Sequence, residues 1–449
     1  MRKLTLLVIV ILLVSSFVGP SFAQDGGTIA DIAATNPDLG TLMLAISAAD
    51  PSVAATLAGD GEYTVFAPTN EAFTTALEKL GVDAATVLGD TELLTSILLY
   101  HVVEGTVMYE DALGLDKAKV TTLEGEDLSV SVLDEFVGVN QANVIETDIV
   151  ASNGVIHIID DVLVPPSVLY GLVADATDLG TEDNPLTLLF IPSENAQEVQ
   201  AGADELTSLL SEATGFVIDA RVATDYAAAI EAMCGGEAEI GALNTFGYVL
   251  ASGRGCANVG VVSVRFGTSF YAGQIVARAD SGIESLEDIT TDTVFCRPDP
   301  LSTSGWIIPS IAMRAAGIDV DTLSENVIDA GGHDGVVNAI YSGECQAGAT
   351  FVDARSQVED EHPDVRDVVL VIAESAPIPN DTLSFSSDVP YAMQLLLVDG
   401  LLNIANDEAN VALLEQVYNW TSLARASDAF FDDFREQLDA AGVDVENLQ

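Results

Sequence analysis

The sequence contains few basic residues. It has 15 Lys and Arg against 70 Asp and Glu, a formal net charge of −55 at pH 7. Nucleic acids and anionic lipid surfaces bind clusters of Lys and Arg, so this charge balance excludes both as partners. The carboxylates are spread along the chain and form no acidic block. We therefore interpret them as a solvated acidic surface suited to a salty environment, and not as a metal-binding tract.

Cysteine is also scarce. The four cysteines, Cys234, Cys256, Cys296 and Cys345, all lie in the second half of the chain. They form no Cys-x-x-Cys motif and no Cys/His cluster, so we expect no zinc site, and no other metal or cofactor is predicted. In an exported chain an even number of cysteines predicts disulfides, and four cysteines allow three pairings.

Long apolar runs are missing except at the start of the chain. Arg2 and Lys3 precede an apolar run over 4–18, and Ser21-Phe22-Ala23 then has the small residues of a cleavage site. The run of about 15 residues is shorter than the roughly 20 that a membrane-spanning helix needs. We predict that residues 1–23 are a signal peptide and that the protein is secreted or periplasmic. An uncleaved N-terminal anchor is the alternative.

Several enzyme motifs are missing as well. The sequence has no Gly-x-Ser-x-Gly elbow and no Walker loop, and it has no cluster of metal ligands. We predict no catalytic residue and do not expect an enzyme.

Helical and strand patterns alternate after the apolar start of the chain. Apolar residues recur at helical spacing over 29–49, and Tyr63–Phe66 predicts a short strand. A helix capped by Thr69 or Asn70 is expected next. Residues 154–166 are apolar and β-branched and end in a proline pair, which predicts a strand that stops there. This mixture indicates an α+β domain.

Three segments of this domain resemble the signature blocks of the fasciclin family. They are TVFAPTNEAF (64–73), LLYHVVEG (98–105) and ASNGVIHIIDDVLVPP (151–166). The resemblance implies a fasciclin-like domain over 24–167, of a family associated with adhesion to cells, matrix or polysaccharide. His101 in the second block invites a catalytic interpretation, but no nucleophile–base pair accompanies it. We interpret His101 and His157 as structural residues.

A two-lobe α/β fold is predicted for the second half. Periodicity is lost over 168–184, which predicts a short linker, and strands then alternate with helices over 185–449. Two such patterns joined by two crossings predict lobe 1 at about 185–280 and 376–449, and lobe 2 at about 281–375. Ligands of such folds lie between the lobes. The pairings Cys234–Cys256 and Cys296–Cys345 are favoured, because each disulfide then closes within one lobe.

Two predicted helix starts in lobe 2 carry polar side chains. Ser302-Thr303-Ser304-Gly305 follows one strand, and His333 opens a helix after another. Hydroxyl and N–H groups at a helix start hold anions, but Ser and Thr are also ordinary helix caps. His333 is open to the same two interpretations. Because the whole chain is acidic, we expect any anion site here to use neutral donors in a closed cleft.

Five collinear segments resemble the phosphonate- and phosphite-binding components of ABC importers. They are ATDYAAAIEAM (223–233), SFYAGQIVARADSGIESLEDI (269–289), DPLSTSGWIIP (299–309), GGHDGVVNAI (331–340) and SAPIPND (375–381). The resemblance implies a periplasmic-binding-protein fold of type II. It also implies a small phosphonate-like anion as ligand and an importer permease as partner.

The same resemblance implies a ligand site of eight residues: Tyr226, Tyr271, Ser302, Thr303, Ser304, His333, Asp353 and Asp381. The serines, the threonine and the histidine are expected to hold the oxyanion, with Tyr226 reaching the same oxygens and Tyr271 lining the cleft. The two carboxylates are expected to meet a distal amine of the ligand. A strand-end cap for Asp353 and a turn residue for Asp381 are the alternatives.

One segment departs from the family pattern. Where relatives have Gly-Pro-Leu-Ser-Tyr, this chain has Asn244-Thr245-Phe246-Gly247-Tyr248, in a segment expected to face the ligand. The ligand therefore stays open among phosphonate, phosphite and related oxyanions. We expect a solute-binding protein for an ABC importer, with the fasciclin-like domain attaching it to a surface or matrix polymer. The alternative is a secreted adhesion protein whose second domain binds a different ligand.

Overall fold

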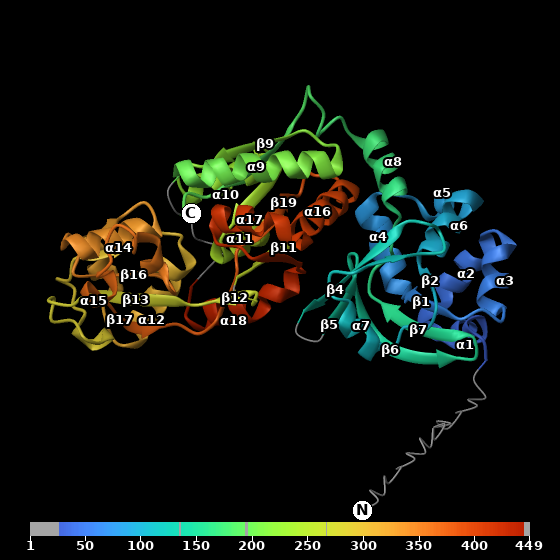
Figure 1. Cartoon of the computed structure of the whole chain (residues 1–449), viewed down its shortest axis with the longest axis horizontal. Helices are drawn as coiled ribbons and strands as arrows, with labels where there is room; N and C mark the ends of the chain where they lie inside the picture. Colours follow the sequence, from blue (N-terminus) through green and yellow to red (C-terminus); the bar gives the residue numbers. More distant parts are fainter. Residues whose placement is uncertain (1–26, 134–135, 194–195, 266, 444–449) are drawn as a thin grey trace, which may run out of the picture.

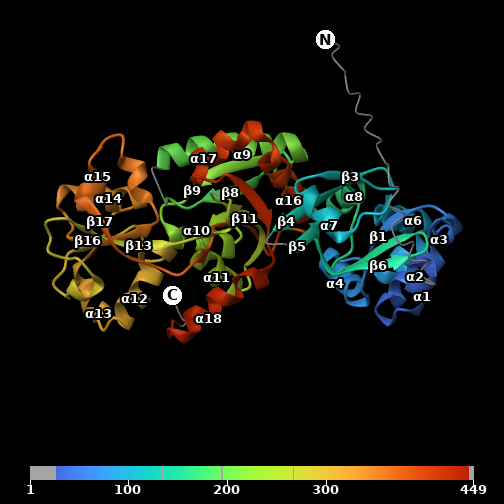
Figure 2. The same ribbon diagram turned by 60° about the horizontal axis from the view of Figure 1, so that its bottom comes forward.

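Three bodies follow one another along the molecule: an N-terminal domain, lobe 1 and lobe 2 (Figures 1 and 2). The computed structural model describes residues 27–133, 136–193, 196–265 and 267–443. The predicted signal peptide, residues 1–23, lies outside the described residues. No helix among the described residues is long and apolar enough to cross a membrane.

The N-terminal domain packs helices against a seven-stranded sheet, which agrees with the α+β expectation. The strand order is β2-β1-β7-β6-β5-β4-β3. The strands are β1 (Tyr63–Pro68), β2 (Val102–Glu104), β3 (Lys119–Thr121), β4 (Asp127–Leu133), β5 (Phe136–Val139), β6 (Ala142–Ala151) and β7 (Gly154–Ile159). The helices are α1 (Ile29–Thr35), α2 (Gly40–Ala48), α3 (Pro51–Ala58), α4 (Asn70–Leu80), α5 (Ala84–Gly89), α6 (Thr91–Tyr100) and α7 (Tyr109–Ala112).

Local sequence explains how this domain begins and ends its elements. Of the two predicted caps, Thr69 is the one used: its Oγ1 accepts a hydrogen bond from the Ala72 N–H at 3.0 Å. Gly154 opens β7 with φ 143°, and a Cβ there would lie 1.9 Å from the Tyr63 carbonyl oxygen. Only glycine allows the two strands to approach so closely.

Both histidines of this domain hold backbone groups in place. The His101 ring is buried, with Nδ1 2.8 Å from the Ile97 carbonyl oxygen and Nε2 accepting from the Leu163 N–H at 2.9 Å. His157 bonds the Val107 carbonyl oxygen through Nε2 at 2.9 Å. These contacts agree with the structural interpretation of both residues.

Helix α8 (Pro166–Ala176) occupies much of the stretch predicted as a linker over 168–184. Its buried residues Leu169 and Val173 join the hydrophobic core of lobe 1, together with Ala72 and Ala76 of α4. Tertiary packing thus orders a segment whose own sequence shows no clear period. The N-terminal domain and lobe 1 share one continuous apolar cluster.

Polar contacts reinforce this junction. The Tyr391 hydroxyl donates to the Asp161 carboxylate at 3.2 Å, and Lys79 Nζ lies 5.0 Å from the centroid of the Tyr391 ring. Lys117 Nζ donates to Ser422 Oγ at 3.3 Å. The N-terminal domain is therefore docked on lobe 1, on the side away from lobe 2 (Figure 1).

Lobe 1 is a six-stranded sheet in the order β20-β11-β19-β10-β8-β9, with helices on both sides. Strands β8, β9 and β10 are parallel, whereas β11, β19 and β20 introduce antiparallel pairs. The strands are β8 (Leu186–Phe190), β9 (Ile218–Val222), β10 (Ile240–Leu243), β11 (Ala257–Val264), β19 (Thr382–Ser386) and β20 (Ser422–Arg425). The helices are α9 (Ala196–Thr214), α10 (Tyr226–Cys234), α11 (Thr245–Gly253), α16 (Tyr391–Asn406), α17 (Val411–Tyr418) and α18 (Asp432–Ala440).

Lobe 2 is a five-stranded sheet in the order β15-β14-β16-β13-β17. Its strands are β13 (Gly273–Arg278), β14 (Phe295–Arg297), β15 (Val327–Asp329), β16 (Ala347–Phe351) and β17 (Val369–Glu374). Its helices are α12 (Ile308–Ala315), α13 (Val320–Leu323), α14 (His333–Ser342) and α15 (Val365–Val368).

The boundary predicted near residue 280 is wrong by one strand. Strand β13 lies inside the lobe 2 sheet, where it pairs with β16 and β17. The sequence did not reveal this because both partners of β13 come about 70 to 100 residues later in the chain. The chain crosses between the lobes at β12 (Phe270–Tyr271) and β18 (Ile378–Pro379), which pair antiparallel. We refer to this two-stranded connection between the lobes as the hinge.

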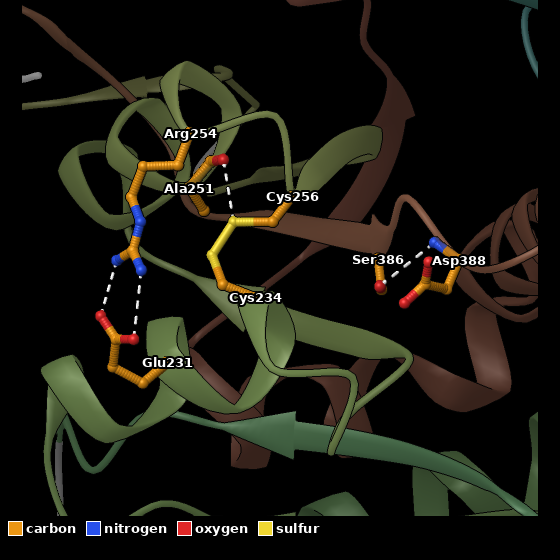
Figure 3. Close-up of a disulfide and its surroundings, with 7 residues drawn as sticks. All are labelled: Glu231, Cys234, Ala251, Arg254, Cys256, Ser386 and Asp388. Atoms are coloured by element: carbon orange, nitrogen blue, oxygen red, sulfur yellow. Dashed lines mark hydrogen bonds and ion pairs between the residues drawn. A yellow bond between two sulfur atoms is a disulfide. The ribbon is translucent and has the colours of Figure 1, made fainter.

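Both favoured disulfide pairings are confirmed. Cys234–Cys256 joins the end of α10 to the segment before β11 in lobe 1, and the Cα atoms are 4.9 Å apart (Figure 3). Beside it, Arg254 pairs with Glu231 at 2.6 Å. Cys296–Cys345 links β14 to the segment before β16 in lobe 2, with Cα atoms 5.9 Å apart.

Candidate functional site

A small polar cavity lies where the two lobes meet, beside the hinge. About 20 Å³ of it is accessible to the centre of a water-sized sphere, which is room for a compact polar group. Its lining residues are Ile191, Ser193, Tyr226, Asn244, Arg265, Tyr271, Ser302, Thr303, Ser304, His333, Phe351 and Asp381. The fold thus brings together seven of the eight predicted site residues and leaves out Asp353.

The loop that leads into α12 supplies the three hydroxyl groups. Ser302, Thr303 and Ser304 are all buried, and Ser302 Oγ accepts from the Gly305 N–H at 3.2 Å. A Cβ at Gly305 would lie 2.3 Å from Pro298 Cδ, so glycine lets the loop fold tightly against β14. Ser302 therefore acts as a cap, while the loop also presents its side chains to the cavity.

Hydrogen bonds across the cleft fix Thr303. Its Oγ1 accepts from Asn244 Nδ2 at 2.8 Å and from the Phe246 N–H at 2.9 Å. A hydroxyl oxygen has two acceptor positions, so both are used and the O–H proton is left to donate to a third group. Asn244 also donates to the Leu301 carbonyl oxygen at 2.9 Å. The segment that departs from the family pattern thus orients the hydroxyl group of Thr303.

His333 reaches the cavity from the start of α14. Its Nδ1 lies 2.8 Å from Thr350 Oγ1, and its backbone N–H donates to the Ser193 carbonyl oxygen in lobe 1 at 3.1 Å. Burial, together with the positive charge of Arg265, lowers the pKa of the His333 imidazole to about 3. The ring is therefore neutral near pH 7. If Thr350 donates to Nδ1, the proton is on Nε2, which then donates into the cavity.

Two tyrosines complete the set of hydroxyl donors. Burial raises the pKa of Tyr226 well above its ordinary value and raises the pKa of Tyr271 to about 12. Both phenols stay protonated at neutral pH, so both keep an O–H group. Tyr271 belongs to the hinge strand β12, which couples the cavity to the crossing between the lobes.

Arg265 and Asp381 form an ion pair at the cavity wall. The Arg265 guanidinium binds the Asp381 carboxylate, and their side chains are 12% and 15% exposed. Burial raises the pKa of the Asp381 carboxyl group, and the charge of Arg265 opposes this shift. Arg265 also lies over the Tyr271 ring, with Cζ 5.8 Å from the centroid. The expectation that only neutral donors build the site is therefore wrong, because a cation lines the cavity.

Asp353 lies outside the cavity and is held by two arginines. Its carboxylate pairs with Arg355 at 2.9 Å and with Arg366. Burial raises the pKa of this carboxyl group, but the bonds from Arg355 and Arg366 outweigh that effect and lower the pKa to about 2. The structure thus does not place Asp353 with the other predicted site residues.

Comparison with known proteins gives the same division of the chain. Residues 188–431, more than half of the chain, match the family model described as ABC transporter, phosphonate, periplasmic substrate-binding protein. The chain belongs to this family. Residues 37–165 match the fasciclin domain, so a fasciclin domain precedes the phosphonate-binding domain.

Individual relatives cover parts of the chain. Protein sll1483 of Synechocystis is 41% identical over 152 residues, which are 34% of this chain and 81% of that protein. The phosphate-import protein PhnD of Mycolicibacterium smegmatis is 34% identical over 177 residues, which are 37% of this chain. That match spans 54% of PhnD.

Among solved structures, a binding protein component of an ABC phosphonate transporter from Pseudomonas aeruginosa matches with a TM-score of 0.53 and 20% identity. The match covers 57% of this chain and 87% of that one. At this identity the similarity shows the fold, which is the two-lobe fold of the phosphonate-binding domain.

Sequence reasoning missed Arg265 and the role of Asn244 in the phosphonate-binding domain. Arg265 lies outside the five resembling segments, and its one sequence signal is that basic residues are rare in this chain. Asn244 could have been found, because its segment was already recognised as a departure from the family pattern. Its contact with Thr303 joins residues 59 apart in sequence, which only the fold brings together.

Proposed function

We propose that the protein is an extracytoplasmic solute-binding protein that captures a small phosphorus oxyanion, a phosphonate, phosphite or related ion, for an ABC importer. The observation that carries the proposal is the convergence of the Ser302, Thr303 and Ser304 hydroxyls with the neutral imidazole of His333 in one cavity. Hydrogen bonds from such buried donors to a charged oxygen are stronger than bonds in water. Three hydroxyls and an N–H suit the several oxygens of a tetrahedral anion.

Membership of the periplasmic family and the apolar start of the chain support export. The names of the relatives, a phosphate-import protein and a phosphonate transporter component, support delivery of the bound ion to an importer permease. The family is one of solute-binding proteins, and this supports a membrane permease as the partner.

A thermal-shift screen of the mature protein tests the proposal. The panel contains methylphosphonate, 2-aminoethylphosphonate, phosphite, phosphate, sulfate and taurine. A ligand at a hundred times its dissociation constant adds about 2.7 kcal/mol of stability. We expect a shift with one or more phosphorus oxyanions and none with taurine. No shift with any compound would contradict the proposal and favour the adhesion protein with a different ligand.

We propose attachment to a surface or matrix polymer as the role of the fasciclin domain. The test compares surface retention of the full chain with that of a chain lacking residues 27–165. Because the fasciclin domain shares a core with lobe 1, ligand affinity of the shortened chain serves as the folding control. Reduced retention with unchanged affinity is expected. Unchanged retention would remove the attachment role.

A further inference from the structure

Arg265 and Asp381 are the two lining residues of the cavity that carry a full charge in the described part of the chain, since His333 is neutral. The two side chains neutralise each other, so the wall of the cavity has no net charge. The pair is largely buried, and the Arg265 Nε atom is buried with no hydrogen-bond partner among the described residues. One N–H of the guanidinium therefore still lacks an acceptor.

Neither of the carboxylates expected to meet an amine is available for one. Asp353 is outside the cavity and is bound by Arg355 and Arg366. Asp381 is in the cavity but already has Arg265 as its counter-ion. The family resemblance implies that the side chains of Asp353 and Asp381 meet an amine of the ligand. In this structure both carboxylates instead pair with arginines.

The ion pair should weaken the binding of a ligand that carries an amine and strengthen the binding of an oxyanion that has none. A ligand ammonium group at Asp381 would place two cations on one buried carboxylate, or would force Arg265 to lose its counter-ion. Either outcome weakens binding, because like charges repel and an unpaired buried charge is unfavourable. An oxyanion without an amine is repelled by the Asp381 carboxylate, but it leaves the Arg265–Asp381 pair intact and gives the guanidinium N–H an acceptor.

The geometry points to Arg265 as a specificity-determining residue that makes this site selective for compact phosphorus oxyanions without an amine. Arg265 neutralises the Asp381 carboxylate and donates a hydrogen bond to the ligand oxyanion. Because the carboxylate is already paired, aminoalkylphosphonates are excluded. This assignment rests on the proposed function, since it names the substrate class of the same cavity.

The test uses isothermal titration of the full-length mature protein with a matched ligand pair. Ethylphosphonate and 2-aminoethylphosphonate differ only in the amine, and methylphosphonate and phosphite extend the series to smaller ions. We expect ethylphosphonate to bind about 100-fold more tightly than its amino analogue, a difference of about 2.8 kcal/mol. Equal affinities, or tighter binding of the amine, would overturn the inference while leaving the proposed function intact. Failure of every ligand to bind would overturn both.

Two variants identify the residue responsible. Arg265→Met removes the charge and keeps an unbranched side chain that fills part of the same space. It should weaken ethylphosphonate binding about 10- to 100-fold and reduce the preference over the amino analogue to less than about 10-fold. Asp381→Asn keeps Arg265 and removes its counter-ion, so it should bind ethylphosphonate more tightly and keep the preference.

The control is Arg254→Met, which removes an arginine from the surface pair with Glu231 and should change neither affinity. If Asp381→Asn abolished the preference and Arg265→Met left it unchanged, Asp381 would be the residue that reads the ligand, and the assignment to Arg265 would be wrong.

Discussion

His101 of the fasciclin domain and His333 of the phosphonate-binding domain are both buried, and their rings are used differently. His101 has a partner at each nitrogen, the Ile97 carbonyl oxygen and the Leu163 N–H. His333 has Thr350 at Nδ1, while its ring lines the cavity between the lobes. Burial lowers the pKa of both, to about 4 for His101 and about 3 for His333.

This difference shows that burial and a shifted pKa do not by themselves mark a binding residue. His101 uses its hydrogen-bonding capacity within the fold, whereas His333 makes one ring hydrogen bond among the described residues, at Nδ1. Counting hydrogen bonds also distinguishes Thr303 from an ordinary helix cap. Both acceptor positions of its hydroxyl oxygen are filled by groups of another segment, which leaves the O–H proton to donate. Hydrogen-bond capacity left over inside a cavity is the more informative signal.

Removing the structural histidine His101 should strongly destabilise the fasciclin domain. His101→Ala leaves two buried backbone groups without partners and opens a cavity, so the free energy of unfolding should fall by about 4 kcal/mol. Urea denaturation measures this loss, and ligand affinity of the folded fraction should not change. A variant as stable as the parent would show that other groups can satisfy the Ile97 and Leu163 backbone.

Disulfide reduction should destabilise the phosphonate-binding domain and leave the stability of the fasciclin domain unchanged. The closed loops span 22 and 49 residues, so the two bonds contribute about 3 and about 4 kcal/mol in the chain-entropy model. The fasciclin domain contains no cysteine. Hydrogen exchange after treatment with a reductant should accelerate in both lobes and stay slow in β1 and β7. Equal acceleration everywhere would show that the shared core makes the molecule one cooperative unit.

His333, which we propose binds the ligand, should have the opposite profile to His101. His333→Ala should weaken oxyanion binding by about 1.5–3 kcal/mol, the range for a hydrogen bond to a charged group. Titration calorimetry on both alanine variants gives the comparison. If His333→Ala bound the ligand as tightly as the parent protein, the role of His333 would be structural, like that of His101.

A pH series tests both rings together. Each folded pKa lies below the unfolded value of about 6.5, so the unfolded chain binds more protons in acid. The stabilisation from each neutral ring is present above pH 6.5 and is lost as the pH falls through the folded pKa, about 4 for His101 and about 3 for His333. At pH 5 each ring should account for a loss of about 2 kcal/mol. The urea midpoints of His101→Asn and His333→Asn should each depend less on pH than the midpoint of the parent protein. If the midpoints of a variant and the parent changed equally with pH, the lowered pKa of that histidine would be contradicted.

Much of the fold could be predicted from the sequence, because the patterns that indicate it lie within short segments. The cap at Thr69, the hydroxyl loop at 302–304 and the alternation of strands and helices are properties of short segments. The lobe boundary and α8 were not accessible in this way. The partners of β13 lie far along the chain, and α8 is ordered by packing against lobe 1.

The amino-acid sequence predicted the two-domain organisation, the disulfide pairs within the lobes, and the gathering of Ser302, Thr303, Ser304 and His333 at one candidate site. The groups that complete this site emerged from the three-dimensional fold. Arg265 and Asp381 are 116 residues apart in sequence and meet in one cavity wall, while Asp353 pairs with neighbouring arginines elsewhere. An ion pair depends on the distance in space between two charges, and composition or spacing along the chain does not fix that distance.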